Sequence, residues 1–156
     1  MLRDHPLNED DALDPVSFIL NIIWLVAGGA VAAAGWFFAA IIMIVTIIGI
    51  PFARAAYDNG VYTLWPFGVT AASRERLYGE DIGTGPIGFL GNIVWFVFAG
   101  WWLALGHLVA AIALAITIIG LPFAWAHLKL AGYALWPIGR SVVRHDIREQ
   151  YRRHRY

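Results

Sequence analysis

The chain has 156 residues, of which 60% are hydrophobic, 15% aromatic and only 14% charged. This apolar share exceeds the ~45–50% that is typical of soluble domains, so a water-soluble fold is not expected. Eleven basic and eleven acidic residues cancel to a net charge of zero, which removes any whole-chain electrostatic argument for nucleic-acid binding. The absence of cysteine excludes disulfides, thiolate metal sites and a cysteine nucleophile.

The chain begins with an acidic segment, residues 1–15, in which five carboxylates stand against Arg3. A secretory signal peptide is positively charged at this place, so the apolar block that follows is expected to be retained. Two blocks without Asp, Glu, Lys or Arg follow, at 15–53 and 82–128. A straight helix over the first block would be ~58 Å long, about twice the ~30 Å hydrocarbon core. Each block is therefore expected to fold back as a helical hairpin.

The two reversals are predicted at Gly35 and at the pair Gly106-His107. Both are places where glycine interrupts an apolar stretch. The helices so defined are at the short end of the range for a membrane span, so a second interpretation makes the later limb of each hairpin a re-entrant helix. The four predicted helices cover residues 17–34, 36–53, 87–105 and 108–124.

An internal repeat is visible when the chain is shifted by 71 residues. Positions 21–70 then align with 92–141 without a gap, and 23 of the 50 aligned pairs are identical. Paired Asn, Trp, Gly and Pro in register are not expected from apolar composition alone, so we infer a duplication. The paired motifs are Asn-Ile-x-Trp at 21 and 92, Thr-Ile-Ile-Gly-x-Pro at 46 and 117, and Leu-Trp-Pro-x-Gly at 64 and 135.

The basic residues indicate how the repeats sit in a membrane. One precedes the first block, three lie in and around the connector, and seven follow from Lys129 onward. The excess of Lys and Arg on cytoplasmic segments places both termini and the connector in the cytoplasm. Each repeat then starts and ends on the same side, which predicts parallel copies related by an axis along the membrane normal.

The predicted fold is an all-α membrane protein with two tandem helical-hairpin repeats, about four transmembrane or re-entrant helices in total. An interfacial helix is expected after each hairpin, at 51–64 and 122–135, because Gly-x-Pro begins a new segment there. The predicted divisions are an acidic cytoplasmic segment 1–15, repeat 1 at 16–70, a connector 71–86, repeat 2 at 87–141 and a basic cytoplasmic tail 142–156.

Three features together resemble the YccF family of bacterial inner-membrane proteins: the two Thr-Ile-Ile-Gly-x-Pro motifs, the two Leu-Trp-Pro-x-Gly motifs and the stretch Gly100-Trp101-Trp102-Leu103. The resemblance covers residues 17–141 and implies a small protein of the bacterial cytoplasmic membrane. It implies no activity, substrate or catalytic residue. The acidic start and the arginine-rich end lie outside it.

The paired helix breaks are the first candidate site. Threonine before each break can return its hydroxyl to a carbonyl of its own helix, which is the structural interpretation. An ion pathway would instead need these hydroxyls and the carbonyls freed near proline to face a wet cavity. The residues concerned are Thr46, Gly49, Pro51, Thr117, Gly120 and Pro122.

A second group of residues is predicted to pack the repeats together. Asn21 and Asn92 could pair between helices, and Gly29 and Gly100 could let two backbones approach closely. Asp58 and its counterpart Lys129 carry opposite charges. They form an ion pair if the repeats pack tightly, and otherwise each lies on a solvated face.

The remaining polar candidates lie near the second block and in the tail. His107 at an outer reversal and His127 on the cytoplasmic side would be too far apart to share a metal, so no metal or other cofactor is expected. Arginine recurs every fourth residue in the tail, which predicts one side of an amphipathic helix docked on anionic lipid rather than on nucleic acid. These arginines are Arg140, Arg144, Arg148 and Arg152.

The leading functional hypothesis is a homo-oligomeric structural or interaction protein of the inner membrane, with lipids and a second copy of the chain as partners. Other protein partners are not predicted. The alternative is a small channel or transporter with its site near the paired breaks. An enzyme is not expected, because the predicted crossings contain no titratable group with a partner.

Overall fold

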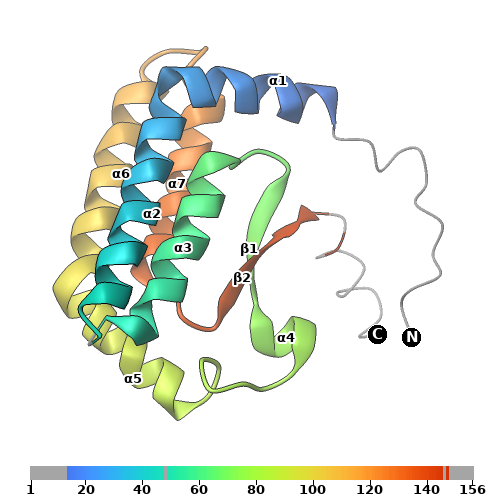
Figure 1. Cartoon of the computed structure of the whole chain (residues 1–156). Helices are drawn as coiled ribbons and strands as arrows, with labels where there is room; N and C mark the ends of the chain where they lie inside the picture. Colours follow the sequence, from blue (N-terminus) through green and yellow to red (C-terminus); the bar gives the residue numbers. More distant parts are fainter. Residues whose placement is uncertain (1–13, 48, 146, 148–156) are drawn as a thin grey trace.

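The computed structural model describes residues 14–47, 49–145 and 147 (Figure 1). The protein is mostly helical, and each element of the first half has a counterpart that begins 71 residues later. The first half contains α1 (Pro15–Trp24), the π-helical turn η2 (Leu25–Gly29), α2 (Ala30–Val45), α3 (Ile50–Leu64) and β1 (Val69–Ser73). Their counterparts are α5 (Pro86–Trp95), η3 (Phe96–Gly100), α6 (Trp101–Ala115), α7 (Leu121–Leu135) and β2 (Arg140–Arg144), and α4 (Arg74–Tyr78) lies between the halves.

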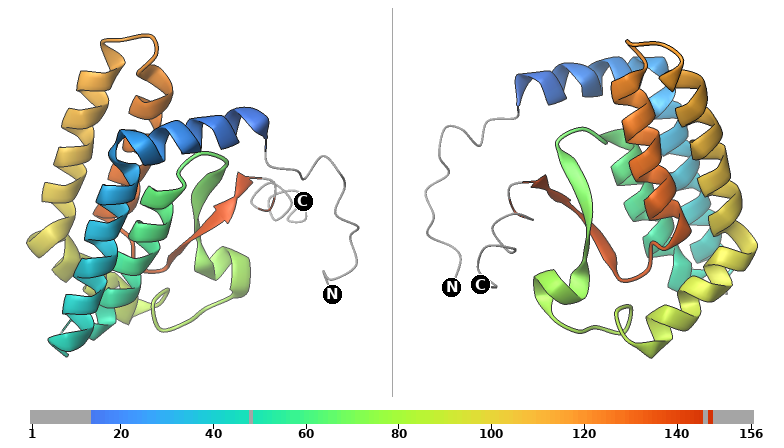
Figure 2. Two further views of the ribbon diagram at one scale, coloured as in Figure 1. Left: turned by 45° about the horizontal axis from the view of Figure 1, so that its top comes forward. Right: turned by 180° about the vertical axis from the view of Figure 1, so that it is seen from behind.

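The apolar blocks form long bent helices rather than hairpins that reverse at their middle. Pro15–Val45 and Pro86–Ala115 are continuous helical runs, and α1 turns sharply into α2 at η2 (Figures 1 and 2). A π-helical turn disturbs the hydrogen-bond ladder, which permits such a kink. Gly28 within η2 has φ 127°, a conformation that suits glycine.

The reversals predicted at Gly35 and Gly106 are therefore wrong. Both glycines lie inside helices, α2 and α6, and a Cβ atom added at either would meet no other atom within 4 Å. A reversal was expected because a straight helix over the whole block would exceed the bilayer. The helix is not straight, because it bends at η2 in the first half and at η3 in the second. The predicted helices 17–34, 36–53, 87–105 and 108–124 thus have the wrong boundaries.

The true reversals are the tight turns at the Thr-Ile-Ile-Gly-x-Pro motifs. A Cβ atom at Gly49 would lie 2.6 Å from the Cα atom of Met43, and one at Gly120 would overlap the carbonyl oxygen of Leu114. Glycine is needed there because the return helix starts so close to the end of the first. The helices α3 and α7 follow, near the predicted 51–64 and 122–135, and they pack along α2 and α6 as the return arms.

The two halves are joined by a two-stranded antiparallel sheet that no pattern in the sequence predicted. Trp65 and Trp136 end their helices before proline, and Gly68 and Gly139 then turn the chain with φ 81° and 82°. The strands β1 and β2 pair so that Ala71 faces its own counterpart, Val142. The fold is therefore mostly helical rather than all-α.

The pairing of equivalent residues relates the halves by an approximate twofold axis through the sheet. As a consequence α2 and α6 run in opposite directions (Figures 1 and 2). The prediction of parallel copies concerns how this axis lies relative to the membrane, and it stays a prediction.

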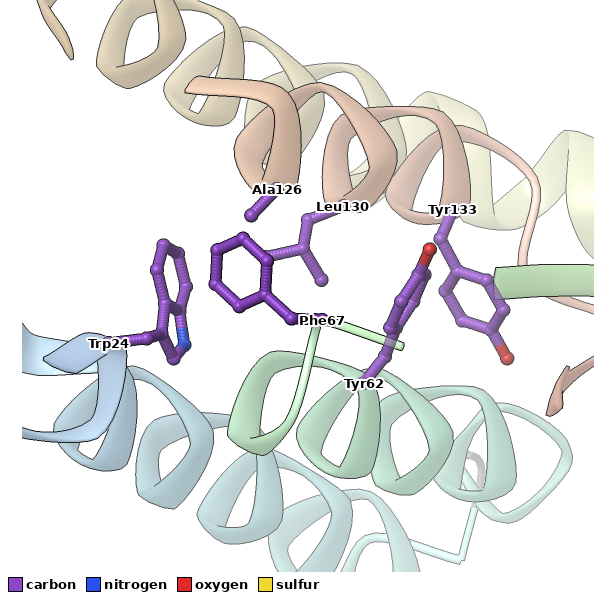
Figure 3. Close-up of a cluster of buried hydrophobic side chains, with 6 residues drawn as sticks. All are labelled: Trp24, Tyr62, Phe67, Ala126, Leu130 and Tyr133. Atoms are coloured by element: carbon purple, nitrogen blue, oxygen red, sulfur yellow. The ribbon is translucent and has the colours of Figure 1, made fainter. Parts of the chain in front are cut away.

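The core lies where the return arms α3 and α7 meet (Figure 3). Tyr62 and its counterpart Tyr133 contact each other edge to face, with ring centroids 5.6 Å apart. Trp24 and Phe67 of the first half and Leu130 of the second half extend this cluster. Large aromatic rings in edge contact fix the relative position of the two arms.

Candidate functional site

The first candidate surface is the apolar face of the two long helices. Each run is apolar enough and long enough to cross a membrane, and only 17% of its most apolar window is buried inside the protein. A core helix of a soluble protein would be mostly buried, so these helices require an apolar environment outside the protein. The hairpin tips share this property, since Ile47 is 73% exposed and Ile118 is 87% exposed.

Charge is confined to the other side of the molecule. The described Asp, Glu, Lys and Arg residues lie on α3, α4, α7 and β2, in the connector, and at Asp14 before α1. The long runs Pro15–Val45 and Pro86–Ala115 carry none. In Figure 1, α4 and the sheet lie on the far side of α3 and α7 from α2 and α6. The protein thus has one apolar and one charged face.

The Asn-Ile-x-Trp motifs clamp the end of each hairpin within its own half. Asn21 Nδ2 donates to Phe67 O, and Phe67 N donates to Asn21 Oδ1, both at 3.0 Å. Asn92 makes the same pair of bonds with Ile138, at 2.9 and 3.0 Å. The two asparagines therefore do not pair with each other, contrary to the prediction, because each bonds the backbone N–H and C=O of a residue 46 positions ahead in its own repeat.

The tryptophan of each motif acts on the helix end beside that turn. Trp24 Nε1 donates to Thr63 O at 2.7 Å, and Trp95 Nε1 donates to Ala134 O at 2.8 Å. The last four carbonyls of a helix have no partner within the helix, so these bonds satisfy groups that would otherwise be buried unpaired. Both indoles thus hold the bent helix against the end of its return arm.

The predicted packing glycines also serve their own repeats. A Cβ atom at Gly29 would overlap the Trp24 ring, and one at Gly100 would lie 3.1 Å from Cδ1 of Trp95. These close approaches are within each half, so Gly29 and Gly100 make room for the clamping tryptophans and do not form a seam between the repeats.

The threonines of the helix breaks bond locally, in agreement with the structural interpretation. Thr46 Oγ1 donates to Met43 O at 3.1 Å, and Thr117 Oγ1 donates to Leu114 O at 3.2 Å. Pro51 and Pro122 lie in the first turns of α3 and α7. The breaks are therefore turns that reverse the chain.

The structure brings His107 and His127 together, contrary to the prediction that they lie on opposite sides of the membrane. Their Nδ1 atoms are 3.0 Å apart across α6 and α7. The error follows from the misplaced reversal, which had put His107 at a helix end. Among the described residues no group of three or more His, Asp or Glu side chains could hold a metal, and the pair forms a hydrogen bond between rings.

Asp58 and Lys129 occupy equivalent positions but make different contacts. Lys129 Nζ donates to Pro66 O and, at 3.1 Å, to Val69 O, and burial lowers the pKa of its amine to about 8. Asp58 lies 3.8 Å from Arg54 Nε in an ion pair along α3, and burial raises the pKa of its carboxyl above the usual range. No ion pair joins the two in the described part of the chain.

The second candidate site is a cavity of about 610 Å³ between α3, α4, α5 and β2. We call it the arginine cavity, because Arg54, Arg74 and Arg140 line it, together with Asp58 and Asp81. Apolar side chains form the rest of its wall, namely Phe52, Ile82, Ile87, Leu90, Val94 and Ile138. No spacing in the sequence predicts this cavity, because its three arginines come from three separate elements.

Arg74 is the most enclosed charge of the cavity. It is 7% exposed, and its Nη2 lies 2.8 Å from Asp81 Oδ1, while its Nε has no hydrogen-bond partner. Arg140 Nη1 donates to Gly132 O at 3.4 Å. Three arginines and two carboxylates therefore line the cavity, and Arg74 Nε is a buried donor without a hydrogen-bond partner.

The predicted helix of tail arginines is not present where the chain is described. Arg140 and Arg144 lie in the strand β2, because Asn92 and Gly139 direct this segment into the sheet. Arg148 and Arg152 lie outside the described residues.

Two segments of the chain, residues 19–69 and 90–140, match the model of the family described as "Inner membrane component domain". The chain belongs to the YccF family. Inner membrane protein YccF of Escherichia coli (strain K12) is 39% identical over 127 residues, which cover 80% of this chain and 86% of that protein. The protein of the same name from Shigella flexneri has the same identity and coverage. No solved structure matches the chain.

Because the family is described by its place in the inner membrane, the apolar face of the long helices is expected to contact lipid. The two matched segments begin 71 residues apart and contain the Asn-x-x-Trp clamps and both tight turns. YccF is described as an inner membrane component, and that description names no enzymatic activity.

Proposed function

We propose that this protein is a non-catalytic structural component of the inner membrane, which enters the bilayer from the cytoplasmic face and keeps both bent helices inside it. One observation carries the proposal: the described charges lie on α3, α4, α7, the sheet and its connections, and at Asp14 before α1, and the long runs and hairpin tips carry none. A protein that is apolar on one face and charged on the other fits a boundary between lipid and water.

The orientation that suits this distribution places the twofold axis along the membrane normal. The helices α1 and α5 then lead into the lipid, and α2 and α6 lie along the membrane plane. Together α1 and η2 contain 10 and 5 residues and are ~22 Å long. This length is enough to pass the middle of a ~30 Å hydrocarbon core. Their helical backbone satisfies its own peptide groups, as lipid requires.

Aromatic contacts at the entry points support this orientation. Trp65 packs against Phe18 at the start of α1, and Trp136 packs against Phe89 at the start of α5. Tryptophan favours the membrane interface. The upright alternative would place the sheet with Arg74 and Arg140 at mid-bilayer depth, which costs several kcal/mol per charge in lipid. In this orientation Asp14, the strand β2 and the connector are on one side, in line with the distribution of basic residues.

Single cysteines test this orientation, because the chain contains none. The variants are Ile47→Cys and Ile118→Cys at the two tips and Arg76→Cys on the exposed face of α4. A membrane-impermeant maleimide is expected to label only Arg76→Cys, and only in inside-out vesicles. Both tips should react after detergent is added. Labelling of either tip from the periplasmic side of intact spheroplasts would overturn the orientation.

We propose further that the protein acts as a homo-oligomer. The outer face of α2 exposes small residues, Ala30, Ala32, Ala34 and Gly35, which allow close helix contact in lipid. Native mass spectrometry from mild detergent should give a defined multiple of the chain. Ala34→Leu should release single chains, whereas Phe38→Leu, at an exposed position of the same helix, should not. A single chain for the unaltered protein would contradict the proposal.

The channel alternative has no specific support in the described structure. The turns that follow α2 and α6 lie at opposite ends of the hairpin pair (Figure 1), and the hydroxyls of Thr46 and Thr117 in these turns are each bonded to their own helix. Selective ion flux in liposomes that is lost on substituting both threonines would restore this alternative.

A further inference from the structure

We propose that the arginine cavity binds one anionic glycerophospholipid, with the phosphate at its guanidinium groups and an acyl chain along α5. The proposal rests on the membrane placement proposed above. It adds a specific lipid site, which is distinct from the general contact of an apolar face with the bilayer.

The polar end of the cavity is suited to a phosphate. Arg74 is more than nine-tenths buried with its Nε unpartnered, and a buried donor of this kind is costly unless an acceptor reaches it. The three arginines exceed the two carboxylates by one positive charge. Guanidinium groups bind phosphate oxygens through strong, paired hydrogen bonds, so one phosphate diester would balance the charge and supply the missing acceptor.

The other end of the cavity is suited to an acyl chain. Ile87 and Leu90 line it and are 68% and 61% exposed, so its wall continues into the apolar outer face of α5. A soluble phosphate compound would leave this wall in contact with water. An amphiphile covers the wall and the arginines together. The volume of about 610 Å³ lies within the ~300–1,000 Å³ that is usual for small-molecule sites.

The counterpart of this cavity in the other half is lined by different side chains. There Lys129 takes the place of Asp58 and bonds the carbonyls of Pro66 and Val69. Phe67 takes the place of Ile138, and its ring packs against Trp24 and Phe123. The open space around Arg74 is therefore not imposed by the repeated fold. It follows from the side chains that differ between the halves.

The test uses the full chain, purified in mild detergent and stripped of lipid, with native mass spectrometry as the readout. Phosphatidylglycerol is expected to give a one-lipid complex at lower concentration than phosphatidylcholine of the same chain length. Arg140→Gln and Arg54→Gln should each weaken that complex about tenfold, through loss of one charge-assisted hydrogen bond. Arg76→Gln is the matched control, since it removes the same charge from an exposed position outside the cavity.

Two further arms separate the possible sources of the phosphate. Inorganic phosphate at millimolar concentration should not displace phosphatidylglycerol if the acyl chain contributes to binding. Displacement by phosphate alone would overturn the lipid assignment and indicate a soluble ligand. Equal weakening by Arg76→Gln, or equal binding of the two lipids, would overturn the site. Circular dichroism of each variant confirms folding, and Arg54, which is largely exposed, provides a variant that does not disturb the interior. Cysteine labelling of the tips reports the membrane placement independently.

Discussion

Asn21 provides the sharpest test of how the repeat is held together. Its side chain is fully buried and satisfies both the N–H and the C=O of Phe67. Asn21→Ala removes both partners at once and leaves two backbone groups inside the protein without hydrogen bonds. Each such group costs about 1–3 kcal/mol, and a water entering the vacated space recovers part of that cost. We expect a loss of about 2–4 kcal/mol in the free energy of unfolding.

The measurement is thermal unfolding in detergent, followed by circular dichroism. For a chain of this length 1 kcal/mol corresponds to a shift of ~2–4 °C, so the midpoint should fall by about 5–15 °C. Asn21→Asp should not restore stability, because its carboxylate accepts from Phe67 N but cannot donate to Phe67 O. Ile22→Ala is the control, since Ile22 is an exposed neighbour on α1.

Asn92→Ala should cost the same within error, because its bonds to Ile138 have the same geometry. A change below about 0.5 kcal/mol for both asparagine variants would refute the argument that these side chains replace the missing backbone partners.

Three further predictions follow from single residues. Gly120→Ala should destabilise the second hairpin by more than 1 kcal/mol, because its Cβ would overlap Leu114, whereas Gly132→Ala, in open space on α7, should be neutral or slightly stabilising; chemical unfolding compares them. Burial lowers the pKa of Lys129 to about 8 from 10.5, so between these pH values the unfolded chain holds a proton that the folded chain lacks. The free energy of unfolding should therefore rise with pH from about 8 to 10. Unfolding midpoints measured across this range check it, and Lys129→Met should lack the slope. Trp95→Phe should cost about 1 kcal/mol in the same assay through loss of the bond to Ala134 O, and no loss would show that this bond is unimportant.

The sequence predicted the elements whose signals are local. Glycine and proline in Thr-Ile-Ile-Gly-x-Pro indicated where α3 and α7 begin, and the backbone bond of Thr46 followed from ordinary threonine chemistry. These features depend on a few adjacent residues. The same holds for the apolar character of the long helices, which the membership of an inner-membrane family supports.

The misplaced reversals and the separation of His107 from His127 share one cause, the assumption that a long apolar helix is straight. Under that assumption the blocks exceeded the bilayer, so a reversal was placed at Gly35, where the structure has unbroken helix. The bend occurs at η2 and η3, in segments that are as apolar as their neighbours and contain no proline. Once the reversal was misplaced, His107 was assigned to the wrong end of its helix.

The sheet and the arginine cavity were missed for a different reason. The strands β1 and β2 are five residues long and become stable only by pairing across the twofold axis. The spacing of Arg140 and Arg144 also fits a strand, since residues four apart lie on the same face of either structure. The cavity depends on side chains from four elements, which no local pattern brings together.

Both repeats keep the same Asn and Trp clamps, whereas the side chains around these clamps differ. One repeat can therefore acquire a site that the other lacks. The bonds that hold each half together use Asn and Trp side chains against backbone atoms, so they persist when the side chains around the turn change. Asp58 and Lys129 differ without disturbing those bonds. In the proposed orientation, with the twofold axis along the membrane normal, both positions would lie at the same depth and on the charged side. Both turns would then meet the same lipid headgroups, and the side chains that differ between the halves, such as Lys129 in place of Asp58, would decide which half binds one.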